Sequence, residues 1–326
     1  YDASQNNNAG KSMSAKVMVQ KEKIVQTVAN ICQNGQSLSS CIVAMNGIDD
    51  TLYYHDSSLA NGAGDSSYRY SGANPNNYVC FGSSESPCPT DNLYRIIGVF
   101  EDKVKLIKYD YATSALLGTD GDYNGTGTSN LSYYKGSLTT INIYYWNKST
   151  YSNTWSESNL NKTNLNTNFI TNIGTEWANK IAMTTWKVGG NTEANIRDTV
   201  PATAYQNEIV NPSVSTTYDA KIGLMYASDY GFAADPSAWT TTLYNYGGSV
   251  NGSTIRSLNW MQMGYYEWTI SPTADYFNIA FNVGNTGYMG YGAANGSSGV
   301  RPSFNLESSI TYVSGSGSAD DPMVIN

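Results

Sequence analysis

Hydrophobic positions near the start of the chain follow a helical period. Between Ser12 and Cys32, apolar side chains recur largely at spacings of three and four among Lys and Gln, at Val17, Val19, Ile24, Val25, Val28 and Ile31. This spacing predicts an amphipathic helix, which Asn34-Gly35 would end. We expect it to dock on the rest of the chain, with packing on another subunit as the alternative. The polar stretch Tyr1–Lys11 predicts an extended tail.

From Thr51 the pattern changes to short runs of β-branched and aromatic residues separated by Gly, Asn, Pro and Ser. Such runs predict strands, which we expect at Leu52–Tyr54, Tyr94–Phe100, Val104–Tyr109, Ile181–Val188, Ile222–Ala227, Trp268–Ile270, Val300–Leu306 and Val324–Ile325. Few helices among many short strands indicate an α+β fold. Because no linker follows residue 51, we expect an N-terminal segment over residues 1–50 and one domain over residues 51–326.

Two local features add detail. Glu101-Asp-Lys103 separates two expected strands and predicts a hairpin. One helix, or two short ones, fits Ser156–Trp177, because apolar residues keep near-helical spacing at Leu160, Leu165, Phe169, Ile173 and Trp177. Gly174 offers an early end to this helix.

The stretch Tyr276–Phe304 has an unusual composition, because Tyr, Asn, Gly and Ser crowd it with poor strand continuity. Its borders, Glu267–Ser271 and Gly299–Leu306, have the character of strands. Tyr offers rigid contact area, and Ser, Gly and Asn offer adaptable hydrogen bonds, as in recognition surfaces. The expected ligand contacts are Tyr276, Phe277, Asn278, Asn282, Asn285, Tyr288, Tyr291 and Asn295. An ordinary surface loop is the alternative.

Composition and charge narrow the choice of partner. The chain of 326 residues carries 18 Lys and Arg against 26 Asp and Glu, for a net charge of −8, which argues against nucleic acid as a partner. No apolar run reaches the roughly 18 residues of a membrane span. Charged residues make up only 13% of the chain, so solubility must come mainly from neutral polar groups. This profile suits an extracellular protein.

The four cysteines fall in two local pairs, Cys32 with Cys41 and Cys80 with Cys88. The short loops favour pairing within each couple over the other connectivities, and disulfides imply an oxidising compartment. Reduced thiols in a cytosolic protein are the alternative. Zinc is disfavoured, because neither spacing is C-x2-C and the only histidine, His55, is distant from the second pair in sequence.

Several segments resemble a family of uncharacterised secreted or surface proteins of gut Firmicutes-type bacteria, namely Leu52–Asp56, Tyr68–Tyr78, Asp91–Phe100 and Gly299–Leu306. The likeness covers about residues 51–326. The family ending Arg-Pro-x-Phe-x-Leu followed by Gly-x-Gly-x-x-x-Asp-Pro, here Gly315–Pro322, resembles the last strands of a C-type-lectin-like domain of the formylglycine-generating-enzyme type. The resemblance implies a C-type-lectin-like fold of short mixed strands with one or two helices.

The same resemblance bears on function. The wider superfamily includes phage and bacterial receptors whose binding residues lie just before the final Gly-[Phe or Val]-Arg strand, and Tyr276–Ser298 occupies that place here. The enzymatic branch uses a cysteine pair near the C-terminal part of its domain, whereas this chain has no cysteine after Cys88. The resemblance therefore implies ligand binding and argues against that catalysis.

Candidate catalytic residues are few. A Ser-His-Asp triad would need His55, which in a Tyr-rich strand is better explained as a hydrogen-bonded structural residue. The 26 Asp and Glu leave paired carboxylates for glycoside hydrolysis open, although no pair stands out. Glu267 precedes the proposed loop and could equally cap a strand end.

One segment resembles part of a metal-binding motif. Asp120–Gly125 matches the first half of a calcium loop, with Asp120, Asp122 and Asn124 as candidate ligands. The twelfth position is Leu131 instead of Glu, so the full motif fails, and a Gly-rich turn is the alternative. No other cofactor is expected.

These observations predict an extracellular or cell-surface bacterial protein, adhesin-like, that binds a protein or glycan ligand through Tyr276–Asn295 without catalysis. The alternative is a structural subunit of a pilus, filament or surface layer, assembled through the N-terminal helix and tail. A glycan hydrolase is the least favoured hypothesis, because it needs a carboxylate pair at a cleft.

Overall fold

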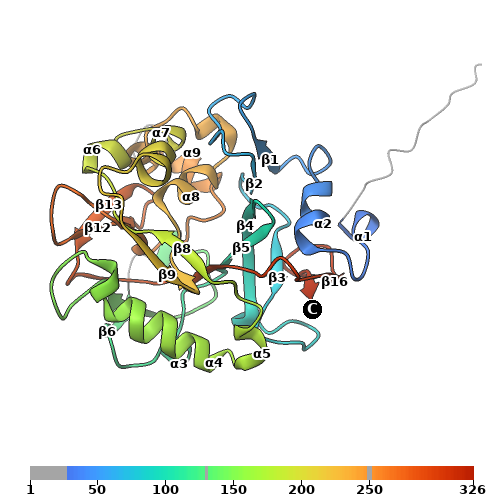
Figure 1. Ribbon diagram of the computed structural model, residues 1–326, viewed down its shortest axis with the longest axis horizontal. Helices are drawn as coiled ribbons and strands as arrows, with labels where there is room; N and C mark the ends of the chain where they lie inside the picture. Colours follow the sequence, from blue (N-terminus) through green and yellow to red (C-terminus); the bar gives the residue numbers. More distant parts are fainter. Residues whose placement is uncertain (1–27, 129–130, 248–251) are drawn as a thin grey trace, which may run out of the picture.

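An antiparallel sheet of seven strands lies at the centre of the computed structural model, which describes residues 28–128, 131–247 and 252–326 (Figure 1). The order is β1-β2-β4-β5-β15-β10, and β3 also pairs with β4. The bounds are β1 (Leu52–His55), β2 (Ser67–Tyr70), β3 (Tyr78–Cys80), β4 (Leu93–Phe100), β5 (Lys103–Lys108), β10 (Ile222–Gly223) and β15 (Ser303–Asn305). Small antiparallel sheets and short helices surround it, so the predicted α+β class is confirmed.

Four smaller sheets complete the strands. They join β14 (Ser297–Ser298) to β7 (Ile141–Tyr145) and β6 (Tyr123–Gly127), β8 (Thr184–Lys187) to β9 (Thr217–Ala220), β16 (Tyr312–Ser314) to β17 (Val324–Ile325), and β11 (Glu267–Pro272) to β12 (Ile279–Val283) and β13 (Met289–Ala293).

The helices are short. They are α1 (Val28–Ile31), α2 (Leu38–Ala44), α3 (Ser114–Leu117), α4 (Ile170–Asn172), α5 (Thr175–Ala178), α6 (Glu193–Ile196), α7 (Pro201–Tyr205), α8 (Ala227–Phe232) and α9 (Gly252–Ser257), with turns of 3-10 or π type at η2 (Thr90–Asn92), η3 (Leu131–Tyr133), η4 (Trp155–Glu157), η5 (Leu160–Phe169), η6 (Gln206–Val210), η7 (Pro236–Ala238) and η8 (Leu243–Gly247). Figure 1 shows α6, α7, α8 and α9 gathered at the upper left and α3, α4 and α5 along the lower edge.

The two central strands are buried on both faces, which explains their nearly continuous apolar sequence. Ile96 and Leu106 belong to the largest hydrophobic core, whereas Ile97 and Ile107 belong to a second core. Successive side chains of a strand point to opposite faces. The sheet therefore separates two cores, one under η5 and one under α7, α8 and η8.

The hairpin between β4 and β5 forms where the sequence predicts it. Phe100 pairs with Lys103, and Glu101 in the turn has a left-handed φ of 57°. The neighbouring strand β2 explains why β4 carries a glycine at position 98, because a Cβ atom on Gly98 would lie 2.2 Å from the carbonyl oxygen of Tyr68. Only glycine lets β2 and β4 approach this closely.

Other predicted strands form with changed bounds. Ile181–Val188 shortens to β8, Val300–Leu306 shortens to β15, and Trp268–Ile270 lengthens to β11. Ile222–Ala227 shortens to β10, because Ala227 already begins α8. The side chain of Asp229 accepts a hydrogen bond from the Tyr226 N–H over 2.9 Å and thereby caps that helix. A helix cap thus ends a run of residues that favour strands.

The predicted helix over Ser156–Trp177 forms as two pieces. η5 runs into α4, and Gly174, with a φ of 81°, separates them from α5. Leu160, Leu165 and Phe169 are fully buried in the largest core. The apolar spacing therefore predicts the buried face of the first piece, and the glycine predicts the break.

Both predicted disulfides are present, Cys32–Cys41 and Cys80–Cys88. Disulfides are consistent with an extracellular protein. The first one ties α1 to α2, whose buried Ile42 packs into the largest core. No helix in the three described ranges is long and apolar enough to cross a membrane.

The predicted N-terminal helix lies mostly outside the described residues. Of Ser12–Cys32, the described part begins at Val28 and contains α1, and the predicted tail Tyr1–Lys11 lies wholly outside. The filament hypothesis depends on these segments, so it stays a prediction.

Candidate functional site

The stretch Tyr276–Phe304 forms a framed β-hairpin. β12 pairs with β11 on one side and with β13 on the other, in the register Phe281 opposite Tyr291. The prediction of poor strand continuity was wrong, because the glycines of this stretch lie in the turn and beneath aromatic rings. The turn closes with the Gly284 N–H donating to the Tyr288 carbonyl over 2.8 Å, and Gly287 takes a φ of 98°.

A buried ion pair holds the two borders of this hairpin together. Arg301 Nε donates to Glu267 Oε1 over 2.7 Å, and Arg301 Nη2 donates to the Met261 carbonyl over 2.7 Å. Both charged side chains are at most 2% exposed. Burial raises the pKa of the Glu267 carboxyl, although Arg301 opposes that shift. Glu267 is therefore part of the frame and does not face a ligand.

Two tyrosines of the hairpin, Tyr288 and Tyr291, meet Tyr244 of η8 and Tyr266 before β11. The hydroxyls of Tyr266 and Tyr288 lie 3.4 Å apart, and the rings of Tyr244 and Tyr288 meet edge to face with centroids 6.2 Å apart. Tyr244, Tyr266 and Tyr291 are between 37% and 46% exposed. Together with Arg197, these four residues are called the tyrosine surface below.

Arg197 lies over two of the four rings of the tyrosine surface. Its guanidinium carbon lies 4.1 Å from the ring centroid of Tyr244 and 5.2 Å from that of Tyr291. Glu193 accepts a hydrogen bond from Arg197 Nη1, and Asp198 lies 3.4 Å from Arg197 Nε. Ion pairs on both sides therefore restrict the guanidinium to a position over the rings.

Two glycines explain why the ring of Tyr288 can lie against the strands of the hairpin. A Cβ atom on Gly284 would lie 2.2 Å from the Tyr288 ring, and one on Gly290 would lie 2.8 Å from it. Burial raises the pKa of Tyr288 to about 12. The phenol therefore stays protonated at neutral pH and can donate a hydrogen bond.

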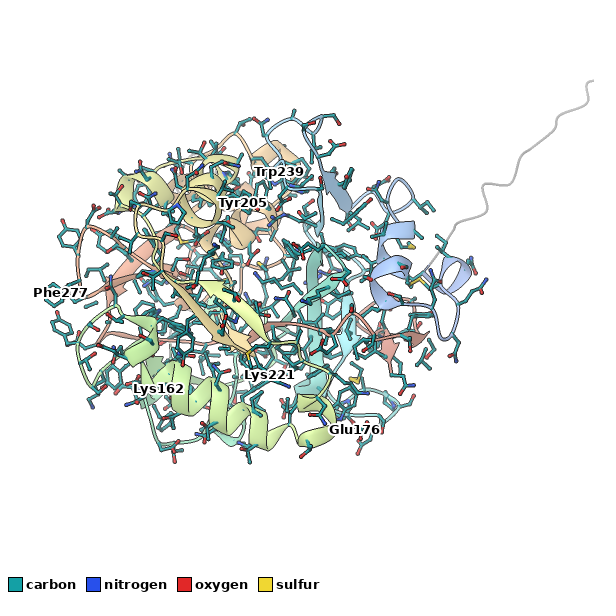
Figure 2. All side chains as sticks on the ribbon, viewed as in Figure 1. Lys162, Glu176, Tyr205, Lys221, Trp239 and Phe277 are labelled. Atoms are coloured by element: carbon teal, nitrogen blue, oxygen red, sulfur yellow. A yellow bond between two sulfur atoms is a disulfide. The ribbon has the colours of Figure 1, made fainter. Side chains whose placement is uncertain are left out.

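The predicted contact residues do not form one surface. Tyr276 and Phe277 lie in the connection from β11 to β12, 54% and 72% exposed, and Figure 2 shows Phe277 pointing outward at the edge of the molecule. Asn153 Nδ2 holds this connection by donating to the carbonyls of Thr273, Tyr276 and Ile279. β12, which is about 14 Å long at the usual rise per residue of a strand, separates this connection from the turn between β12 and β13.

The asparagines of the predicted set have different positions. Asn282 is only 6% exposed and lies under Gly290 and Gly292, so it does not line the surface. Asn278 and Asn285 are half-buried, and the Asn285 carbonyl accepts a hydrogen bond from Gln262. Asn295 is exposed in the turn after β13.

Sequence reasoning missed Arg197, Tyr244 and Tyr266 as members of the tyrosine surface. Tyr244 and Tyr266 belong to Tyr-rich segments, but no spacing connects them to Tyr288. Only the packing of η8 and α6 beside β13 brings them together.

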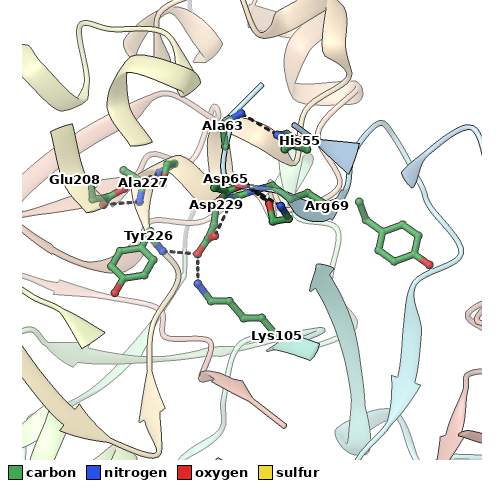
Figure 3. A network of polar contacts seen from close by, with 12 residues as sticks. His55, Ala63, Asp65, Arg69, Lys105, Glu208, Tyr226, Ala227 and Asp229 are labelled. Carbon is green, nitrogen blue, oxygen red and sulfur yellow. Dashed lines mark hydrogen bonds and ion pairs between the residues drawn. The ribbon is translucent and has the colours of Figure 1, made fainter. Parts of the chain in front are cut away.

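His55, the only histidine, has a structural environment. Its Nδ1 atom accepts a hydrogen bond from the Ala63 N–H over 3.1 Å (Figure 3), and its ring packs against Phe232 and Trp239. Burial, together with the charge of Arg69, lowers its pKa to about 3. The side chain of its neighbour Asp56 instead accepts from Ser58. A neutral, enclosed imidazole suits the structural interpretation.

One pair of carboxylates shares a cation. Arg69 lies 2.5 Å from Asp65 and 3.6 Å from Asp229. Although burial opposes the shift, Arg69 lowers the pKa of Asp65. A general acid in glycoside hydrolysis needs a raised pKa, so this pair does not favour the hydrolase hypothesis.

The three candidate calcium ligands are engaged within the protein. Asp122 is 1% exposed, and its two oxygens accept the N–H groups of Lys148 and Leu160 over 3.0 and 2.8 Å. Asp120 accepts from Asn168, and Asn124 accepts from Tyr145. Within the described ranges, no group of three or more His, Cys, Asp or Glu could hold a metal ion.

We expect Asp122→Ala to lower the free energy of unfolding by about 2–3 kcal/mol, because the buried Leu160 N–H and the partly buried Lys148 N–H lose their acceptor. Urea unfolding with and without calcium measures this. Asp120→Ala, at an exposed position, is the control and should change stability by less than about 0.5 kcal/mol. Calcium that stabilises the unmodified protein but not Asp122→Ala would support a metal site instead.

No protein-family model, curated protein or solved structure matches this chain. The resemblance to the C-type-lectin-like family therefore stays a prediction.

Proposed function

We propose that this chain is an extracellular, cell-surface binding protein with a C-type-lectin-like domain, which binds a protein or glycan ligand through the tyrosine surface. The observation that carries the proposal is the group of four partly accessible tyrosines, in which Tyr288 contacts Tyr244 and Tyr266 while Arg197 lies over the rings of Tyr244 and Tyr291. The two disulfides support an oxidising location. The proposed function needs no catalytic group.

A protein ligand is favoured over a glycan. Tyr and Arg are enriched among the residues that contribute most to protein–protein binding. The rings already contact one another, and Arg197 is held by two carboxylates, so binding would order few additional side chains. Pre-organisation of this kind lowers the entropic cost of association.

We expect Tyr288→Ala with Tyr291→Ala to abolish ligand binding on a protein array, and each single change to weaken binding by about 30-fold, as for residues that contribute 2 kcal/mol. Tyr276→Ala with Phe277→Ala, at the other end of β12, is the matched control. A glycan array probed with the same variants distinguishes the ligand classes. Full binding by the Tyr288 and Tyr291 double variant would exclude the tyrosine surface as the site.

A further inference from the structure

A second candidate site lies away from the tyrosine surface, in a pocket with a cavity volume of about 510 Å³. β2, β5, β8, α7 and α8 all contribute to its lining. This volume falls in the usual range of small-molecule sites. Because Lys105 lies in its lining and is almost completely buried, the site is called the Lys105 pocket below.

Two cations and two carboxylates form a buried network at the Lys105 pocket (Figure 3). Lys105 Nζ lies 2.5 Å from Asp229 Oδ2, and Arg69 Nη2 lies 2.5 Å from Asp65 Oδ2. Arg69, Lys105 and Asp229 are each at most 4% exposed. The chain therefore holds ionisable side chains in its interior, where burial lowers the pKa of Lys105 although Asp229 opposes that shift.

Lys105 and Arg69 use only part of their hydrogen-bond donors within the network. A lysine carries three N–H donors and an arginine five. Within the described part of the chain, Lys105 Nζ donates to Asp229, whereas Arg69 donates to Ser67 and Asp65. Aromatic rings also lie close to Lys105, with the Tyr226 ring centroid 4.6 Å from Nζ. An anionic ligand could accept the donors that are left over.

Charges at the mouth of the Lys105 pocket also favour an anion. Lys103 and Lys187 line it and form no ion pair within the described ranges. The whole lining contains four basic residues, Arg69, Lys103, Lys105 and Lys187, against three acidic ones, Asp65, Glu101 and Asp229. The lining thus carries a surplus of positive charge in a chain whose net charge is −8. Such a local surplus raises the concentration of anions at the pocket.

The walls combine rings with neutral polar groups. Tyr205 and Tyr226 supply aromatic surface, whereas Thr184, Thr185 and Asn305 supply hydroxyl and amide groups. A wholly apolar ligand would deprive these polar groups of water without replacing their hydrogen bonds. A ring that carries hydroxyls can stack on the aromatic surface and also bond to the polar groups.

We propose that the Lys105 pocket binds an acidic sugar, with the carboxylate at Lys105 and the sugar ring against the aromatic wall. None of the residues that line this pocket belongs to the tyrosine surface. The lining favours a ligand that has an anionic group, a ring and several hydroxyls.

The test is isothermal titration calorimetry on the full chain at low salt, with D-galacturonate, D-glucuronate and N-acetylneuraminate as probes. We expect at least one to bind with a dissociation constant of about 1 mM or tighter, and D-glucose, which lacks the carboxylate, to bind at least about 10-fold more weakly. Lys105→Met should weaken binding by about 10- to 100-fold, as for a lost charged hydrogen bond.

A variant at Lys187, which lines the entrance of the Lys105 pocket, keeps the test decisive if Lys105→Met does not fold. Lys187→Gln should weaken binding by about 2- to 5-fold, and the difference should shrink at high salt. Lys162→Gln, an exposed lysine on η5 outside the pocket lining, is the matched control and should bind normally. Tyr288→Ala with Tyr291→Ala should also bind the acidic sugar normally, which separates this proposal from the proposed function.

Several outcomes would overturn the proposal. They are no binding by any of the three acidic sugars, equal affinity for D-glucose, and equal affinity for benzoate or inorganic phosphate, which would indicate a general anion site. A folded Lys105→Met variant with unchanged affinity, or identical affinities for Lys187→Gln and Lys162→Gln, would place binding elsewhere.

Discussion

Arg301→Met is expected to lower the free energy of unfolding by roughly 3–5 kcal/mol, because it leaves the buried carboxylate of Glu267 without its cation. The change also removes the donor to the Met261 carbonyl. The pair lies where β11 meets the segment before β15. Its loss therefore loosens the contact between these two borders of the β12–β13 hairpin. Urea unfolding at neutral pH measures the effect.

The double variant Glu267→Leu with Arg301→Met separates two effects on the free energy of unfolding, the contribution of the ion pair and the destabilisation by an unpaired buried charge. Replacement of a whole buried ion pair by apolar residues is often neutral, so the double variant should be clearly more stable than Arg301→Met. Arg256→Met, at a half-exposed arginine that contacts the Tyr133 ring, is the control and should cost less than about 1 kcal/mol. An equally small loss for Arg301→Met would show that the pair does not brace the frame.

Acidification is expected to destabilise the protein through His55. In the unfolded chain this histidine takes up a proton near pH 6.5, whereas burial lowers its folded-state pKa to about 3. Its contribution to stability is therefore complete above pH 6.5 and is lost progressively as the pH falls toward 3. At about 1.4 kcal/mol per pH unit, the loss between pH 6.5 and pH 5 is roughly 2 kcal/mol.

Two measurements check this prediction. Because His55 is the only histidine, its ring proton signal in an NMR spectrum is assigned without variants, and it should not titrate between pH 8 and pH 4. The pH dependence of urea unfolding should be shallower for His55→Gln between pH 7 and pH 5, since the carboxylates titrate alike in both proteins. A titration midpoint near 6.5 in the folded protein would contradict the enclosed, neutral imidazole.

Contacts between neighbours in the sequence were predictable. The Cys80–Cys88 disulfide, the turn at Glu101 and the break at Gly174 all depend on short segments. In each case the residue type limits the local backbone or the loop length, so a single sequence carries the information. The α+β class follows in the same way from many short runs of strand-forming residues.

Strand ends and the hairpin were less predictable, because tertiary contacts outweigh local preference. The run after Ile222 favours a strand, yet the cap supplied by Asp229 begins a helix at Ala227. The stretch after Tyr276 is rich in Gly and Asn, yet pairing with β11 makes it a regular hairpin. Strand propensity depends on the neighbours that a strand acquires.

The sequence by itself determined the local turns, the disulfide pairing, the fold class and the Tyr-rich character of one segment. Only the tertiary structure decided which side chains act together: Tyr266 meets Tyr288 across 22 positions, and Lys105 meets Asp229 across 124. Lys105 lies among alternating lysines that suggest an exposed face, but both faces of β5 are buried. The spacing of residues along the chain predicts contacts only between near neighbours. Ion pairs and ring contacts between distant segments depend on how the sheets and helices pack.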